Sequence, residues 1–498
     1  MNTSKSIKAS LEQLAIFAWF ATGIVAGIFS RCIVVRAYAG TGKTWTIAQG
    51  ITHVPQSVKT ILYAVFGKRN EVEAQDKIYD SRVTIKTLHA LGFHYIRKQW
   101  GFIQAKGYVE KYRCETVCPG IPWQVTGQLV KLVDFLKNSF IGIPSLEDIQ
   151  KVMDNRGIEC LGAEFKPWNS RLPELAVKVL ELSKEKSKLI SFGDMVWLPV
   201  TLGIVTPDFD LVCIDECQDM SLPQLTMGIQ ACKPNGRLCL VGDDKQGMFG
   251  FRGSISNAIT MFKQKLNAAE LTLSATFRCP KIVVKEAQAY VPEYMAHETN
   301  NEGELVRWNE EKAWGEVKVN DAVLSRKNAP LMRVCLALLR KGTPARIEGK
   351  DIGKGLLDIV ASLEANTVPE FMDKLSTWQT LALSKATGQN AGQKQDRIAD
   401  EYETLKTLAE TCNTVDAISD KIKGLFVDSH SEYGPRPKPA VVCSSVHKAK
   451  GLEWDNVYML MESFKVRATQ SDEEAQEERN IRYVAITRAK ARLCYVVG

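Results

Sequence analysis

The chain has 498 residues, of which 45% are hydrophobic and 24% charged, and its formal net charge is +7. This length suffices for about three to four domains with buried cores, and the composition excludes a disordered, collagen-like or low-complexity chain. The mild excess of Lys and Arg is compatible with a polyanionic partner but does not require one.

The first predicted element is an uncharged apolar stretch at 14–29, which follows Lys5 and Lys8. It resembles a signal peptide or a short anchor, but it is shorter than the roughly 20 apolar residues that a transmembrane helix needs. A nucleotide-binding pattern begins shortly after it, at residue 37. We therefore expect a buried helix, no membrane partner and a cytoplasmic protein.

Residues 37–44, Ala-Tyr-Ala-Gly-Thr-Gly-Lys-Thr, follow a β-branched run at 32–35 and precede a predicted helix. Such a loop binds phosphate because its glycines let the backbone amides turn inward, the lysine adds a positive charge and the last hydroxyl can ligate Mg²⁺. Ala37 stands where the general pattern has its first glycine. The alternative is a chance glycine turn between a strand and a helix. The predicted ATP-binding residues here are Gly40, Thr41, Gly42, Lys43 and Thr44.

Thirteen cysteines are scattered along the chain, and several lie within apolar runs typical of strands. An odd, scattered set favours free thiols in a reducing, cytoplasmic compartment. Cys114, Cys118 and Cys160 are alternative candidates for a metal or iron–sulfur site, although their spacing is unorthodox and no convincing fourth ligand follows.

Asp215 and Glu216 come directly after a predicted apolar strand at 211–214. The carboxyl ends of strands are where open α/β sheets place their ligand sites. Phosphoryl transfer needs charge neutralisation and a positioned water, so Asp215 is predicted to hold Mg²⁺ and Glu216 to orient or deprotonate the water. The alternative for two such acids is a solvated turn.

A third predicted strand, 238–241, is followed by Gln246 and then by Phe249, Phe251 and Arg252. A glutamine beside the nucleotide can contact the γ-phosphate, and exposed aromatic side chains with an arginine suit base stacking. The alternative for the two phenylalanines is ordinary core packing.

These three segments resemble motifs I, II and III of the UvrD/Rep-type superfamily 1A DNA helicases, whose loop usually carries alanine at the position of Ala37. Three positions depart from the family pattern: Trp45, where relatives often carry arginine, Phe251, where many have tryptophan, and Leu88, where an aromatic residue is usual. The resemblance extends from Gln13 to Lys490. Further segments resemble the Q motif (11–13), motif Ia (61–68), motif Ib (83–89), motif IV (273–278), motif IVa (322–328), motif V (445–453) and motif VI (478–489).

The resemblance implies roles around ATP. It implies that Gln13 reads the adenine edge, Phe277 stacks on adenine, Arg278 reaches the γ-phosphate, Arg488 acts as an arginine finger, and Glu453 belongs to the ATP site. Because these arginines lie in the second half of the chain, we expect a composite site that closes when two lobes meet over ATP. The implied catalytic set is Lys43, Glu216, Gln246, Arg278 and Arg488. The implied single-stranded DNA contacts are Phe66, Thr87, His89, Phe249, Phe251, Arg252, Ser445 and His447.

The implied fold is α/β, with two RecA-like P-loop NTPase lobes and mainly helical insertions. Since the chain ends ten residues after Arg488, we expect no fused nuclease domain. The predicted domains are RecA-like domain 1A (1–91 and 190–275), helical insertion 1B (92–189), RecA-like domain 2A (276–350 and 438–498) and a short helical, 2B-like insertion with a linker (351–437).

The predicted function is that of an ATP-dependent DNA helicase or translocase that uses ATP and Mg²⁺. By resemblance it moves 3′ to 5′ on single-stranded DNA and also takes tailed duplex DNA. One alternative is a translocase motor of a repair or defence complex that unwinds little alone. Another is a nucleotide-gated DNA-binding module with a decayed ATPase, against which the intact catalytic set argues.

Overall fold

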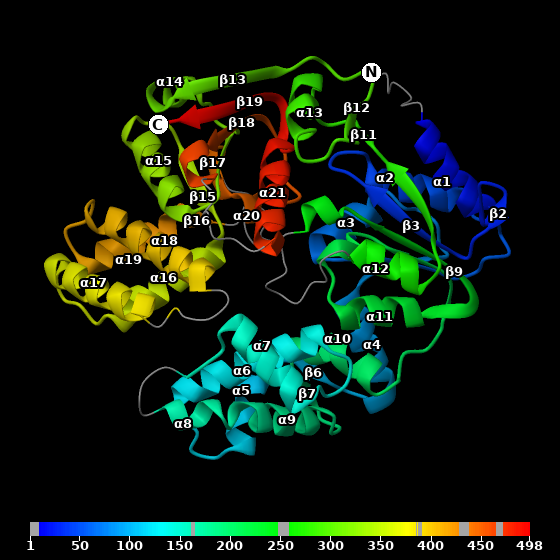
Figure 1. Ribbon diagram of the computed structural model, residues 1–498, viewed down its shortest axis with the longest axis horizontal. Coiled ribbons are helices and arrows are strands. Elements are labelled where there is room, and N and C mark those ends of the chain that lie inside the picture. Colours follow the sequence, from blue (N-terminus) through cyan, green and yellow to red (C-terminus); the bar gives the residue numbers. More distant parts are fainter. Residues whose placement is uncertain are drawn as a thin grey trace. The chain divides into compact units, whose positions relative to one another are not determined.

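The computed structural model describes residues 9–160, 165–247, 258–384, 386, 391–427, 438–464 and 472–498. It divides into two compact units, Met1–Ala275 and Thr276–Gly498, each built around one parallel sheet with helices on both faces (Figure 1). This confirms the predicted α/β class with two RecA-like lobes.

The first unit contains a six-stranded parallel sheet in the order β10-β3-β9-β8-β4-β5. Strand β4 is apolar along its whole length and every residue of it is buried, as expected of a parallel strand covered by helices on both faces. Separate hydrophobic clusters lie on the two faces of the sheet. The strands are β3 (Cys32–Ala37), β4 (Ile61–Val65), β5 (Val83–Thr87), β8 (Phe209–Ile214), β9 (Cys232–Gly242) and β10 (Ala269–Leu273).

The apolar stretch at 14–29 is only partly helical. Helix α1 (Leu11–Thr22) ends at Gly23, which has a left-handed backbone with φ 76°, and a two-stranded hairpin of β1 (Ile24–Val25) and β2 (Ile28–Phe29) follows. Trp19 and Phe20 of α1 are fully buried against the sheet. Among the described helices, none is both long and apolar enough to cross a bilayer.

Helices α2 to α4 and α10 to α12 belong to the first unit and lie around its sheet (Figure 1). Helix α4 runs through the predicted domain boundary at residues 91 and 92. It packs closely against α10, because a Cβ atom at Gly92 would lie 1.7 Å from the Met195 carbonyl oxygen. The helices are α2 (Lys43–Thr52), α3 (Lys68–Gln75), α4 (Leu88–Trp100), α10 (Phe192–Thr201), α11 (Leu222–Gln230) and α12 (Ala258–Lys265).

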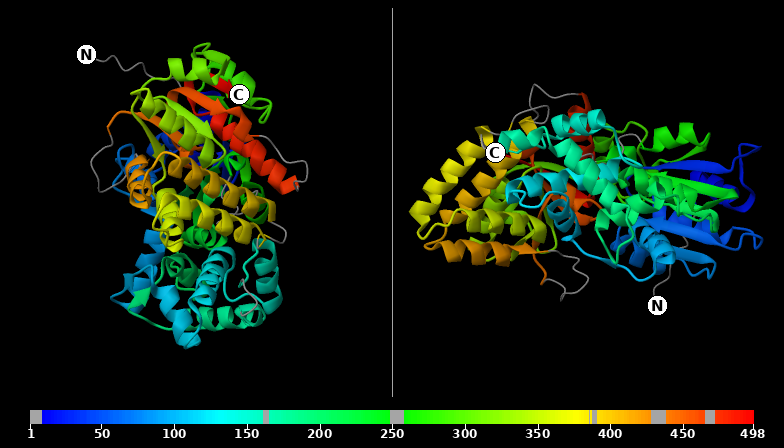
Figure 2. Two further views of the ribbon diagram at one scale, coloured as in Figure 1. Left: turned by 90° about the vertical axis from the view of Figure 1, so that its left-hand side faces the viewer. Right: turned by 90° about the horizontal axis from the view of Figure 1, so that it is seen from below.

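The inserted helices between α4 and α10 form a cluster with its own hydrophobic core (Figure 2). A buried ion network crosses this core, in which Lys137 pairs with Glu110 and Asp194, and Arg113 pairs with Asp194 at 2.6 Å. The elements are β6 (Gln104–Ala105), α5 (Val109–Val117), α6 (Trp123–Ser139), α7 (Leu146–Arg156), α8 (Lys166–Asn169), α9 (Leu172–Ser183) and β7 (Leu189–Ile190).

The second unit contains a seven-stranded parallel sheet in the order β13-β19-β18-β14-β17-β15-β16. The strands are β13 (Glu304–Asn309), β14 (Ala322–Ser325), β15 (Ala345–Glu348), β16 (Phe426–Val427), β17 (Val441–Ser445), β18 (Trp454–Leu460) and β19 (Ala489–Val497). Two short strands, β11 (Ala275–Thr276) and β12 (Met295–Ala296), also occur near its start. The helices are α13 (Lys281–Ala287), α14 (Glu310–Glu316), α15 (Asn328–Arg340), α16 (Lys350–Ser362), α17 (Val368–Ser384), α18 (Ala391–Ala409), α19 (Val415–Leu425), α20 (Val446–Ala449) and α21 (Asp472–Ile486).

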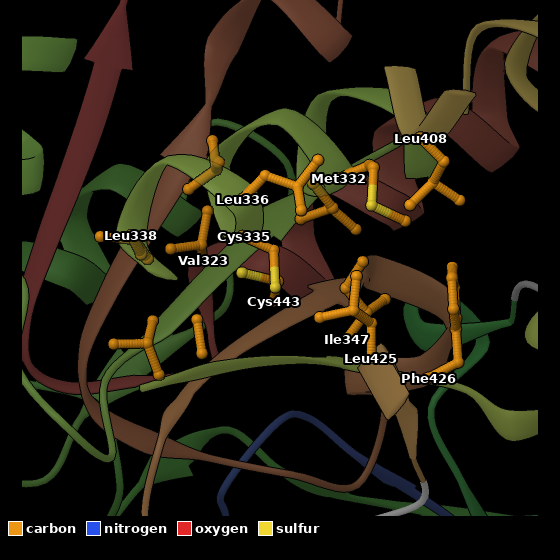
Figure 3. Packing of buried hydrophobic residues seen from close by; sticks show 14 of the residues in the cluster. Val323, Met332, Cys335, Leu336, Leu338, Ile347, Leu408, Leu425, Phe426 and Cys443 are labelled. Carbon is orange, nitrogen blue, oxygen red and sulfur yellow. The ribbon is translucent and has the colours of Figure 1, made fainter. Parts of the chain in front are cut away.

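The insertion of the second unit shares one hydrophobic core with the sheet. Figure 3 shows Leu408 of α18 and Leu425 of α19 packed with Val323 of β14 and Met332 of α15. The insertion also supplies the edge strand β16, which pairs with β15, so it is not wholly helical. Helices α16 to α19 are therefore an integral part of this unit rather than a separately packed module.

Asp400 on α18 connects the insertion to the start of α15. Its carboxylate accepts hydrogen bonds from the backbone amides of Asn328 and Ala329 at 2.8 and 2.7 Å. It thereby caps α15, whose N-cap side chain makes no such bond. We expect Asp400→Ala to destabilise the second unit by about 1–3 kcal/mol, since it leaves these amides without their acceptor. Urea unfolding followed by hydrogen exchange in α15 peptides measures this effect. The control is Asp373→Ala on an exposed face of α17, and equal stability of the two variants would contradict the expectation.

Candidate active site

The phosphate-binding loop lies between β3 and α2 in the first unit. Gly40 and Gly42 have φ angles of 68° and 79°, values in the left-handed region that favours glycine, and α2 begins directly afterwards at Lys43. The amides at the start of α2 therefore face the end of the loop, where a helix N-terminus attracts anions. This is the local geometry that phosphate binding requires.

The carboxyl end of β8 brings the two predicted acids to this loop. The Thr44 hydroxyl lies 3.3 Å from Oδ2 of Asp215, and the Lys43 ammonium pairs with the Glu216 carboxylate at 2.9 Å. Glu216 has φ 53°, a left-handed conformation that is uncommon outside glycine and is enriched at functional sites. The structure therefore brings together four residues that the sequence placed in two separate segments.

Burial alone would lower the pKa of Lys43, but the carboxylates of Glu216, Asp243 and Asp215 outweigh it and raise that pKa. Burial and the neighbouring Glu216 raise the pKa of Asp215, whereas Lys43 opposes this shift. Lys43 therefore stays charged at neutral pH and offsets the negative charge of these acids. A triphosphate entering the loop would compete with Glu216 for this ammonium group.

A second buried network joins the acids to the carboxyl end of β9. Gln218 donates to Glu216 at 2.6 Å, and its carbonyl oxygen accepts from the backbone amide of Asp243 at 3.0 Å. The Gln246 amide donates to the Asp243 carboxylate at 2.7 Å. The predicted γ-phosphate sensor, Gln246, is thus linked through Asp243 and Gln218 to the predicted catalytic base, Glu216.

Burial raises the pKa of Asp243 to about 6, against the opposing charge of Lys43. A raised carboxyl pKa stabilises the folded state at low pH, and this contribution is lost as pH rises through about 6. We expect Asp243→Asn to remove that loss, so its stability relative to the unmodified chain rises between about pH 4 and 6, the range between the ordinary carboxyl pKa and the raised one. Urea unfolding monitored by hydrogen exchange in β9 peptides tests this. An equal pH dependence of both proteins would contradict it.

The fit of this site to Mg²⁺ rests on its oxygen donors. Thr44 and Asp215 offer a hydroxyl and a carboxylate, and Mg²⁺ is commonly held by one or two carboxylates together with substrate phosphates and waters. Over the described ranges, no group of three or more His, Cys, Asp or Glu side chains could enclose a metal ion. The donors therefore fit a cation that arrives with a nucleotide.

The cysteines give no support to the alternative metal site. All thirteen are free thiols, and Cys114 and Cys160 lie in the core of the inserted helices. Burial raises the pKa of Cys114 to about 12 and that of Cys160 to about 11, which disfavours the thiolate that a metal would need.

The other predicted residues of the first unit surround the same sheet edge. Gln13 donates to the Thr46 hydroxyl of α2 at 3.0 Å and accepts from the Ser10 amide, so its side-chain nitrogen and oxygen each have a partner within this unit. Phe66 follows β4, Thr87 caps α4, and His89 lies on the first turn of α4. Phe249, Phe251 and Arg252 lie outside the described residues.

The second unit gathers its own set of predicted ATP residues. Arg278 pairs with Glu453 at 2.5 Å, and the buried Arg488 donates to the carbonyl oxygens of Val484 and Leu452 at 3.0 and 3.1 Å. Burial and the charge of Arg278 lower the pKa of Arg488 to about 10. Arg278 and Arg488 thus bring two positive charges close together, and Glu453 offsets only one of them. Such an arrangement favours binding of an anion.

The remaining predicted residues of this unit are placed as follows. The Phe277 ring lies 4.5 Å from the ring of His297, centroid to centroid. Ser445 ends β17, and His447 lies on the short helix α20 that follows. Their predicted contacts with adenine and DNA stay predictions.

Two domain families match the chain, the UvrD/REP helicase N-terminal domain over residues 23–267 and the UvrD-like helicase C-terminal domain over residues 258–497. The chain belongs to the UvrD-like helicase family. Its relatives include F-box DNA helicase protein 1 of Schizosaccharomyces pombe, which is 24% identical over 92% of this chain and 55% of its own length. The putative ATP-dependent DNA helicase YjcD of Bacillus subtilis is 24% identical over 52% of this chain and 36% of its own. The ATP-dependent DNA helicase PcrA of Leuconostoc citreum is 22% identical over 52% of this chain and 37% of its own length. The chain thus spans about half or less of the length of these curated relatives.

Three residues of this candidate site in the UvrD-like chain were missed in the sequence. Tyr63, Gln218 and Asp243 make direct hydrogen bonds to the predicted residues Asp215, Glu216 and Gln246. Gln218 and Asp243 stand inside the motif segments, and their polar character next to buried strands was the available signal. Tyr63 stands in an apolar strand and gave no comparable signal.

Proposed function

We propose that this UvrD-like protein is an ATP-dependent DNA helicase or translocase that moves on single-stranded DNA, with 3′ to 5′ direction. The observation that carries the proposal is the joining of Lys43 and Thr44 with Asp215 and Glu216 at one sheet edge. Family membership and the names of the relatives, which are DNA helicases, support DNA as the second substrate.

In the proposed reaction, Lys43 leaves Glu216 and binds the phosphates of ATP in the loop after β3. Mg²⁺, when bound by Thr44 and Asp215 with the nucleotide, neutralises phosphate charge. Glu216, released from Lys43 and held by Gln218, accepts a proton from the attacking water. Gln246 contacts the γ-phosphate, and hydrogen bonds through Asp243 and Gln218 connect it to Glu216.

We further propose that Arg278 and Arg488 of the second unit stabilise the negative charge of the transition state, and that hydrolysis changes the grip on DNA. Phe66, Thr87 and His89 follow strands at the same edge as the ATP site, which supports a link between nucleotide state and DNA contact. Gln13, Phe277 and Glu453 are proposed adenine-side and ATP contacts, and Ser445 and His447 are proposed DNA contacts.

The test is ATP hydrolysis with and without single-stranded DNA, together with strand separation on duplexes that carry either a 3′ or a 5′ tail. We expect DNA to stimulate hydrolysis and the 3′-tailed duplex to be separated. Stimulated hydrolysis without strand separation would favour the translocase motor. Hydrolysis that DNA does not affect would refute a DNA motor, and separation of only the 5′-tailed duplex would refute the direction. The free thiols support a reducing, cytoplasmic location.

A further inference from the structure

Tyr63 is a fully buried residue of β4 whose hydroxyl group reaches the predicted magnesium ligand. It lies opposite Cys213 of the adjacent strand β8, and Asp215 stands two residues beyond Cys213. Because side chains two residues apart on a strand share one face, Tyr63 and Asp215 project to the same side. The phenol donates to Oδ2 of Asp215 at 2.7 Å.

This hydrogen bond completes the fixation of the Asp215 carboxylate. Oδ1 accepts from the backbone amide of Glu216 at 2.9 Å, and Oδ2 also lies 3.3 Å from the Thr44 hydroxyl. Tyr63 is thus the one side chain from β4 that binds this carboxylate among the described contacts, and it comes from outside the P-loop and the acidic segment. Without it, the carboxylate keeps the Glu216 amide and the longer contact with the Thr44 hydroxyl as partners.

Tyr63 acts as a donor in this contact. Burial and the charge of Asp215 raise the pKa of Tyr63 well above its usual value, so the phenol remains protonated. A neutral phenol is a poor ligand for Mg²⁺, which prefers carboxylate and phosphate oxygens. Tyr63 therefore influences a cation through Asp215 rather than by direct coordination.

We propose that Tyr63 is a positioning residue for the divalent cation, which orients Asp215 so that its carboxylate and the Thr44 hydroxyl meet Mg²⁺·ATP in the required geometry. This inference rests on the proposed ATPase function. Residues that orient metal ligands by hydrogen bonds typically change metal affinity by about 10- to 100-fold when they are removed.

Tyr63→Phe removes only the hydroxyl group and keeps the buried ring. Tyr95→Phe is the control, because Tyr95 is a buried tyrosine of the same unit whose hydroxyl donates to the backbone carbonyl of Thr206 at 3.1 Å, in the segment between α10 and β8. Each variant loses one phenol hydrogen bond, which is buried for Tyr63 and partly buried for Tyr95. They differ in whether the acceptor is the predicted magnesium ligand.

The experiment measures binding of a non-hydrolysable ATP analogue by calorimetry while the Mg²⁺ concentration is varied, using the full chain. We expect Tyr63→Phe to require about 10- to 100-fold more Mg²⁺ for half-maximal binding, and Tyr95→Phe to stay within about twofold of the unmodified chain. Analogue binding in the absence of Mg²⁺ should be alike in all three proteins. An unchanged Mg²⁺ requirement in Tyr63→Phe, or equal shifts in both variants, would overturn the proposal in favour of core packing.

A double-mutant cycle with Asp215→Asn separates positioning from folding defects. If Tyr63 acts through Asp215, adding Tyr63→Phe to Asp215→Asn should cause little further change in the Mg²⁺ requirement. A full additional shift would overturn the proposal. If the unmodified chain binds the analogue without any Mg²⁺ dependence, the magnesium assignment itself fails. If it binds no analogue, the proposed ATPase function fails.

Discussion

Glu216→Gln is expected to reduce DNA-stimulated ATP hydrolysis by about 10²- to 10⁴-fold while nucleotide binding is retained, because it removes the proposed general base. The glutamine keeps the size of the side chain and the contact with Gln218. It weakens the pairing with Lys43, which Glu216 holds at 2.9 Å. Since the nucleotide competes for that same ammonium group, binding of an ATP analogue should be as strong as in the unmodified chain or stronger.

The matched control is Glu270→Gln in the same unit. Like Glu216, Glu270 is a paired carboxylate, and its partners are Arg36 at 2.9 Å and Lys263 at 2.6 Å. It lies on the edge strand β10, and none of the contacts described for it involves the acids of the site. We expect its hydrolysis rate to stay within about twofold. Substantial turnover by Glu216→Gln would show that the water is activated by another group. Loss of analogue binding would show that Glu216 serves mainly to position Lys43.

Much of the first sheet could be predicted from local sequence. The apolar runs at 32–35, 211–214 and 238–241 lie within β3, β8 and β9, because a parallel strand covered on both faces needs a continuous apolar run. The hairpin after α1 could not be predicted from an uncharged stretch alone. It depends on the left-handed backbone at Gly23 and on positive φ angles at Ala26 and Gly27. Apolar content specifies burial there but not the place where the helix ends.

The residues of the candidate site also fall into two groups, those that local sequence predicts and those that depend on the assembled sheet. Lys43, Thr44, Asp215 and Glu216 were predictable because each stands in a contiguous segment whose chemistry is local. The role of Tyr63 depends on which strand neighbours β8 and on which face its side chain lies, and both are properties of the assembled sheet. The shared core of the second insertion likewise arises from contacts between residues far apart in the chain, such as Leu408 and Met332. Sequence spacing alone carries no such information.

Arg488 is the second residue for which a large effect is expected. Its guanidinium group is fully buried and is oriented by the carbonyl oxygens of Val484 and Leu452. Although burial and Arg278 lower its pKa to about 10, it remains charged at neutral pH. In the proposed reaction, the phosphoryl group of the transition state is the anion whose charge this guanidinium group stabilises.

Arg488→Lys is therefore expected to lower the maximal rate of DNA-stimulated hydrolysis by about 10³-fold or more, since an arginine finger contributes about 10³ to 10⁵ in rate and a lysine lacks its planar fork of donors. Binding of an ATP analogue should change little, because the P-loop lies in the other unit. Arg492→Lys is the control, as this arginine pairs with Glu304 on β13, away from Arg278. Equal rates in the two variants would refute the finger. A parallel loss of hydrolysis and thermal stability in Arg488→Lys would instead assign Arg488 to the core of the second unit, where its carbonyl contacts join the end of α21 to the segment before β18.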